Sequence, residues 1–136
     1  MKGKNGISST MKNLKSAIVV VTDNERYSVA LCWCLDCDCQ APKVVMKGSS
    51  NEFRYINDSA KQNFIDLFES PFLACMLYVS TEVGQEISQE HFYAVALVIS
   101  FVLNSRYGRN YQLKKPKPDK YLLHNMGLNM KKAVPN

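Results

Sequence analysis

SAIVVVTDNERYSVALCWCL, residues 16–35, is the stretch that decides the fold expected for this chain. Its first seven residues are rich in β-branched side chains, which favour a β-strand. A polar turn at residues 23–25 follows, and residues 26–35 then alternate, with Val29 and Leu31 on the same face. Two such segments joined by a short turn predict an antiparallel hairpin. Because both faces of the second segment are fairly apolar, we expect that strand to lie inside the sheet.

Two further segments extend the expected sheet. KVVMK, residues 43–47, and FRYI, residues 53–56, have the composition and alternation of short strands, and a polar turn at residues 48–52 separates them. Together with the hairpin, they predict an antiparallel sheet of three or four strands.

Helical patterns follow the sheet. A capping-box spacing at residues 59–62 introduces residues 60–69, which carry an apolar face at helical spacing. The apolar run at residues 72–79 fits either a buried strand or a helix, and we favour a helix. Residues 92–103 are apolar nearly all round, which predicts a largely buried helix over about residues 88–105.

These patterns together predict the α+β class, with a small antiparallel sheet packed against two or three helices. The side chains expected to anchor the core are Trp33, Phe64, Phe68 and Leu97. The chain has 136 residues, of which 46% are hydrophobic and 21% charged, as is ordinary for one globular domain. We expect a flexible basic lead-in at residues 1–15, a globular domain at residues 16–110 and a basic extension at residues 111–136.

Apolar runs and cysteines bear on the location of the protein. The chain contains no run of about 18 apolar residues, so no membrane span is expected. The apolar run at residues 17–21 is too short for a secretory signal, and the five cysteines are an odd number. We therefore expect reduced thiols, a cytoplasmic location and no membrane partner.

Charge is sorted into three blocks along the chain. Residues 1–15 carry four basic residues and no acid, and residues 16–103 carry five basic and eleven acidic residues. Residues 104–136 carry eight basic residues and one acid. A strongly basic end of this kind predicts an anionic partner.

The basic end also interleaves cations with tyrosines. Cations neutralise phosphates, and tyrosine rings stack on bases for about 1–3 kcal/mol each. The leading hypothesis is a small intracellular non-enzymatic protein that binds nucleic acid through this segment. The alternative is a protein interaction factor, either an inhibitor or an accessory subunit, that binds an acidic protein surface by charge complementarity; such an end can also dock on the acidic body of its own chain. The residues assigned to the binding site are Arg106, Tyr107, Arg109, Tyr111, Lys114, Lys115, Lys117, Lys120 and Tyr121.

A cluster of cysteines, CWCLDCDC at residues 32–39, is the sharpest local feature. Cys34 and Cys37 have the spacing of a zinc knuckle, so a zinc site is one interpretation. The candidate ligands are Cys32, Cys34, Cys37 and Cys39. Structural zinc sites usually draw two ligands from each of two separated segments, and the chain has no second C-x-x-C pair. We therefore favour small core and loop residues here, and expect no cofactor.

Motifs of catalysis are missing from the sequence. It contains no G-x-S-x-G, no phosphate-binding loop and no H-E-x-x-H, and neither histidine lies in a recognisable catalytic pattern. No catalytic residue is assigned, and the chain is expected not to be an enzyme.

Overall fold

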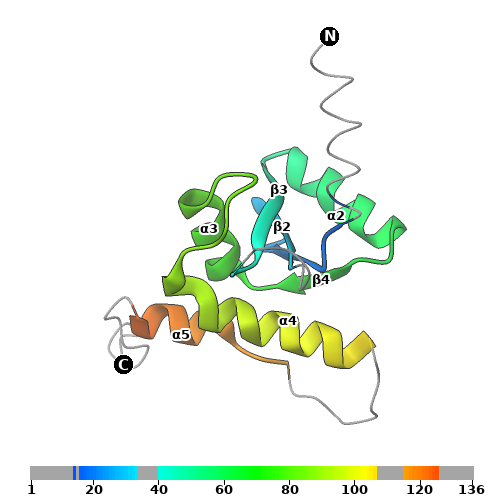
Figure 1. Cartoon of the computed structure of the whole chain (residues 1–136). Helices are drawn as coiled ribbons and strands as arrows, with labels where there is room; N and C mark the ends of the chain where they lie inside the picture. Colours follow the sequence, from blue (N-terminus) through cyan, green and yellow to red (C-terminus); the bar gives the residue numbers. More distant parts are fainter. Residues whose placement is uncertain (1–13, 15, 34–39, 107–114, 126–136) are drawn as a thin grey trace, which may run out of the picture.

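The computed structural model describes residues 14, 16–33, 40–106 and 115–125 (Figure 1). In chain order, the elements are β1 (Val19–Thr22), β2 (Tyr27–Cys32), β3 (Lys43–Ser49), α2 (Glu52–Gln62), β4 (Asp66–Glu69), α3 (Pro71–Ser80), the short 3₁₀ helix η1 (Gln89–His91), α4 (Phe92–Arg106) and α5 (Pro118–Asn125). The predicted α+β class is confirmed. In this part of the chain, no helix is long and apolar enough to cross a membrane.

The sheet has the strand order β3-β2-β1-β4. The hairpin of β1 and β2 is antiparallel, with Val21 opposite Val29, and β2 is paired antiparallel with β3. In contrast to the expected all-antiparallel sheet, β1 and β4 are parallel, with Val20 opposite Leu67. The chain leaves β3 at one edge, passes through α2 and returns to the opposite edge, and this crossover makes the last pair parallel.

The predicted fourth strand lies elsewhere in the structure. Residues 53–56 form the first turn of α2, where Phe53 and Ile56 are three positions apart and both buried. Their alternation therefore reflects helical spacing. Conversely, β4 occupies residues 66–69, which had been assigned to a helix.

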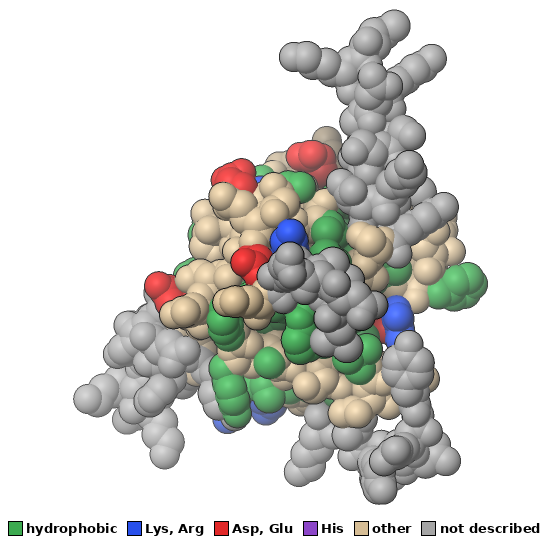
Figure 2. Space-filling model, viewed as in Figure 1, with side chains coloured by type: hydrophobic (Ala, Val, Ile, Leu, Met, Phe, Trp, Pro, Cys, Tyr) green, Lys and Arg blue, Asp and Glu red, His purple; other side chains and the backbone are tan. Residues whose placement is uncertain are grey.

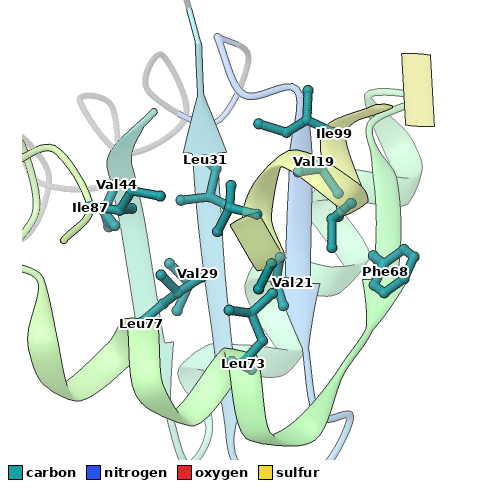
Figure 3. Close-up of a cluster of buried hydrophobic side chains, with 14 of the residues drawn as sticks. Val19, Val21, Val29, Leu31, Val44, Phe68, Leu73, Leu77, Ile87 and Ile99 are labelled. Carbon is teal, nitrogen blue, oxygen red and sulfur yellow. The ribbon is translucent and has the colours of Figure 1, made fainter. Parts of the chain in front are cut away.

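Two layers of helix enclose the sheet, with α2 on one face and α3, α4 and α5 on the other (Figure 1). Alternate residues of β1 point to opposite layers, so Val19 and Val21 join the larger core cluster while Val20 joins the cluster under α2. In Figure 3, Val21 and Val29 lie on the sheet face that Leu73 and Leu77 of α3 cover. Alternate side chains of the hairpin thus belong to different core clusters, one on each face of the sheet.

Of the four predicted core anchors, only Phe68 is buried, with 2% of its surface exposed. Trp33 is exposed because it comes after the last residue of β2, and Phe64 is exposed because it lies in the turn that ends α2. Leu97 is half-buried on α4. The helix predicted over residues 88–105 is α4 preceded by η1, and one side of it is buried.

Both terminal segments contribute to the core. Leu14, from the predicted lead-in, is fully buried in the cluster under α2. Leu122 of α5 is buried in the larger cluster, against α3 and α4. Residues 114–120 contain two prolines, which disfavour a helix that runs through the whole segment. Pro118 is nevertheless the first residue of α5, a position that suits proline because its missing N–H needs no partner there.

Candidate functional site

A tight turn joins β1 to β2. The Oδ1 atom of Asp23 accepts hydrogen bonds from the backbone N–H groups of Glu25 (2.9 Å), Arg26 (2.6 Å) and Tyr27 (2.8 Å), while Asn24 adopts φ 63°. Partial burial acts to raise the pKa of Asp23, but these three bonds and the charge of Arg26 outweigh it, so the pKa is lowered. The turn is thus built around an ionised carboxylate.

A buried polar network lies beneath this turn. Ser28 Oγ is 2.6 Å from Asn57 Oδ1 and 2.8 Å from Thr22 Oγ1, and Asn57 Nδ2 donates to Thr22 Oγ1 at 3.1 Å. At the surface, Asn24 Nδ2 donates to Glu69 Oε1 at 2.9 Å. The network therefore links β1, β2, α2 and β4, and makes the turn a rigid part of the domain.

The predicted binding segment begins at Arg106, which is engaged with the body of the same chain. Its Nε donates to Asp66 Oδ2 at 2.8 Å, and its Nη2 donates to the carbonyl oxygen of Phe64 at 3.1 Å. Lys115 Nζ lies 4.9 Å from the ring centre of Phe68, a cation–π contact. Two of the predicted phosphate-binding cations thus serve packing within the domain.

Two other predicted binding residues, Lys117 and Lys120, have exposed side chains. The remaining predicted binding residues lie outside the described residues: Tyr107, Arg109, Tyr111 and Lys114, together with the side chain of Tyr121. Of the described cations in the predicted interface, Arg106 and Lys115 contact the body, while Lys115, Lys117 and Lys120 are exposed to solvent.

Asp119 holds the same segment to α3. Its Oδ1 accepts hydrogen bonds from Ser70 Oγ at 2.7 Å and from the N–H of Leu73 at 2.9 Å, and its Oδ2 accepts from the N–H of Phe72 at 3.3 Å. Ser70 is the N-cap residue of α3 but makes no cap bond itself, so Asp119 supplies the cap from another helix. A surface pocket of about 430 Å³ lies beside this contact, lined by residues 69–70 and 115–120.

Exposed apolar surface is the other notable feature of the helical layer. The ten residues of α3 include no charged residue, yet Val79 is 63% exposed, and Val83 just after the helix is also exposed. On α4, Phe92 and Tyr93 are exposed. Figure 2 shows hydrophobic side chains gathered over α4 and its border with the sheet. Apolar patches on a folded domain are typical of protein interaction sites.

The cysteine cluster is only partly described. Cys34, Cys37 and Cys39 lie outside the described residues, while Cys32, at the end of β2, and Cys75, on α3, are half-buried. Among the described residues, no three His, Cys, Asp or Glu side chains are placed to hold a metal ion. Since three of the four candidate ligands lie outside the described residues, both the expectation of no cofactor and the alternative of zinc binding stay predictions.

Comparison with known proteins gives the family. Residues 5–102 match the family of bacterial export proteins described as FlhB HrpN YscU SpaS. The chain belongs to this family. It is 35% identical over 96 residues to the flagellar biosynthetic protein FlhB of Aquifex aeolicus, and 36% identical over 107 residues to FlhB of Yersinia enterocolitica. These matches cover 71% and 79% of this chain but 27% and 26% of the relatives, so the chain spans about a quarter of their length.

Solved structures agree with the family assignment. The cytoplasmic domain of FlhB from Shewanella putrefaciens superposes with a TM-score of 0.72 and 28% identity, covering 82% of this chain and 92% of that domain. The C-terminal domain of EscU carrying an asparagine-to-aspartate mutation gives a TM-score of 0.70 and 25% identity, covering 75% and 93%. This chain therefore resembles a domain that is cytoplasmic in the FlhB of S. putrefaciens.

The family corrects the hypotheses on function. Nucleic-acid binding through the basic end is wrong, because FlhB relatives are flagellar biosynthetic proteins of an export family. The alternative, an inhibitor or accessory subunit that binds an acidic surface, does not capture this role either. The family is one of protein-export components. Membership in it does not test for catalysis, so the expectation that the chain is not an enzyme stays a prediction.

The residues that cap α3 and form its exposed apolar face were not identified from the sequence. Asp119 was placed in the basic extension at residues 111–136 without a role of its own, although a Pro-Asp pair is a common start of a helix. The absence of charge from residues 71–80 was visible in the sequence, but it was interpreted only as a sign of burial.

Proposed function

We propose that this chain acts as the cytoplasmic domain of an FlhB-type protein-export component, where it binds other proteins of the export apparatus. Support comes from the near-complete coverage of the S. putrefaciens cytoplasmic domain and from the match to a single quarter of each FlhB relative. On this proposal the chain works in the cytoplasm and acts by binding rather than by catalysis.

The exposed apolar face of α3 is the observation that carries the proposal. A helix that is half exposed to water ordinarily has charged residues on its outer side, and α3 has none. Val79 and Val83 leave apolar surface in contact with water. Removing such surface from water stabilises a complex by about 25 cal/mol per Å². A protein partner that covers this face recovers that free energy.

The rest of the domain suits a docking role because it is rigid around that face. Asp119 fixes the N-terminus of α3, and Lys47 Nζ donates to the carbonyl oxygens of Tyr78 (2.9 Å) and Thr81 (3.0 Å) at the other end. A helix held at both ends loses little conformational entropy when a partner binds.

The test is a binding experiment with the purified full chain and, one at a time, the other export-apparatus proteins of its source organism. Calorimetry should detect at least one of them as a partner, and Val79→Glu should weaken that binding at least tenfold by placing a charge in an apolar contact. Tyr55→Glu is the matched control, since Tyr55 is an exposed aromatic on α2. Absence of binding to every export protein, or equal binding by both variants, would contradict the proposal.

A further inference from the structure

Phe64 is the most exposed large apolar side chain in the described structure, with 89% of its surface accessible. It also has φ 58°, a left-handed conformation that side chains with a Cβ atom rarely adopt. Ile65 N–H donates to Ala60 O at 2.8 Å and Phe64 N–H donates to Lys61 O at 3.3 Å, the bonds of a Schellman motif that ends α2. Glycine is the usual residue at this position, so neither the turn nor the core accounts for a phenylalanine.

The turn that presents Phe64 is rigid. Arg106 holds its carbonyl oxygen through Nη2 and, through Nε, the carboxylate of Asp66 at the start of β4. Phe64 therefore projects from a fixed point at the surface. Strained residues of this kind are concentrated at functional sites, and rigid exposed aromatics are the usual anchors of protein interfaces.

The same chain contains a pocket that can take such an anchor. The 430 Å³ pocket between residues 69–70 and 115–120 is lined in part by Pro116 and Pro118, and a phenylalanine side chain is smaller than this volume. Three lysines, Lys115, Lys117 and Lys120, also line it and have exposed side chains.

The two features lie at opposite ends of β4, which is an edge strand of the sheet that the described residues form. Phe64 comes two residues before the strand, and the pocket begins at its last residue, Glu69. We propose that a second copy of this chain docks here, with the two β4 edges antiparallel about a twofold axis. Each Phe64 then enters the pocket of the other copy, and the contact closes on itself as a dimer.

Charge supports this pairing. Asp66, whose side chain is 43% exposed despite its bond to Arg106, follows Phe64 by two residues. The pocket is lined by three lysines and by two acidic residues, Glu69 and Asp119, of which Asp119 is hydrogen-bonded to Ser70. When Phe64 occupies the pocket, Asp66 therefore lies near a rim with an excess of positive charge. The proposal is independent of the export role, because it concerns Phe64 and β4 rather than the outer face of α3.

Analytical ultracentrifugation of the full chain tests the proposal. A reversible dimer with a dissociation constant of about 1–100 μM is expected for a contact made by a four-residue strand and one aromatic anchor from each copy. Phe64→Gly should weaken dimerisation at least tenfold and yet raise the unfolding temperature, since glycine relieves the left-handed conformation. Tyr55→Ala, which removes an exposed aromatic side chain of α2 away from β4, should leave dimerisation unchanged.

A photo-reactive phenylalanine at position 64 locates the partner surface. In a mixture of isotope-labelled and unlabelled chains, cross-links should join position 64 of one copy to residues 115–120 of the other. A chain that stays monomeric at about 500 μM, or a Phe64→Gly variant that dimerises like the wild type, would overturn the proposal. Cross-links to another surface, or loss of binding to phosphatidylglycerol vesicles by Phe64→Gly in a monomeric chain, would also overturn it.

Discussion

The carboxylate of Asp119 accepts a hydrogen bond from the backbone N–H of Leu73, which is 2.9 Å away and 46 residues earlier in the chain. Through this bond, the first turn of α5 caps α3 and holds the C-terminal segment against the body. The basic end of the chain is thus anchored by its single acidic residue.

Replacing that cap should destabilise the fold. Asp119→Ala removes the acceptor for Ser70, Phe72 and Leu73, and we expect a loss of about 1–2 kcal/mol in the free energy of unfolding. Asp119→Asn keeps an acceptor oxygen and should lose less. Urea denaturation measures both, with Lys120→Ala as the exposed control. Equal stability of Asp119→Ala and the wild type would contradict the cap.

Lys47 makes the corresponding contact at the C-terminal end of α3. Lys47→Met keeps the apolar stem but removes the donor to Tyr78 and Thr81, so we expect a loss of about 1–2 kcal/mol in the free energy of unfolding. Lys61→Met, a change of the same type on the exposed side of α2, should cost little. The two variants are compared by urea denaturation at neutral pH, and similar midpoints would rule out a special role for Lys47.

The lowered pKa of Asp23 predicts an acid-dependent loss of stability. Its side chain is 6% exposed and has a lower pKa in the folded than in the unfolded chain. Its stabilising effect is therefore present above the ordinary pKa of about 4 and is lost as the pH falls through the folded value. The difference in unfolding free energy between the wild type and Asp23→Ala should shrink between pH 6 and pH 3. A difference that stays constant over this range would argue against an ionised turn.

His91 predicts a second change at higher pH. The residue is 2% exposed, and its Nδ1 has no hydrogen-bond partner among the described residues. Burial lowers its pKa despite the opposing charge of Glu90. The unfolded chain therefore takes up a proton more readily, and stability should fall as the pH drops below about 6.5 toward the folded value. In His91→Leu the decline between pH 7 and pH 5 should be smaller, as measured by thermal unfolding at each pH.

The hairpin was predictable because every local signal in residues 16–35 favoured the same structure, a pair of β-strands. Its β-branched composition, polar turn and period of two all favoured paired strands, and the structure confirms them. Residues 53–56 were ambiguous, since Phe53 and Ile56 fit a strand by alternation and a helix by their spacing of three. The short strand β4 was hidden for a related reason, because four residues are too few to establish a period.

The site was less predictable than the fold because its contacts join distant parts of the chain. The cationic character of Arg106 and Lys115 was evident from the sequence, whereas their engagement with Asp66 and Phe68 depends on the tertiary structure. Similarly, Phe64 is typical of a core residue by type, and only the end of α2 places it in solvent. Charge composition therefore led to the hypothesis of nucleic-acid binding, which the family contradicts.

The parallel pairing of β1 with β4 has a consequence for biosynthesis. Val19 of β1 pairs with Asp66 of β4. One side of β1 therefore stays unpaired until the ribosome has synthesised β4, more than 40 residues later. Until those residues emerge, a nascent chain carries an unpaired row of amide and carbonyl groups along its most hydrophobic strand. We expect this interval to be the period when the newly made polypeptide is most prone to aggregate and most dependent on chaperones.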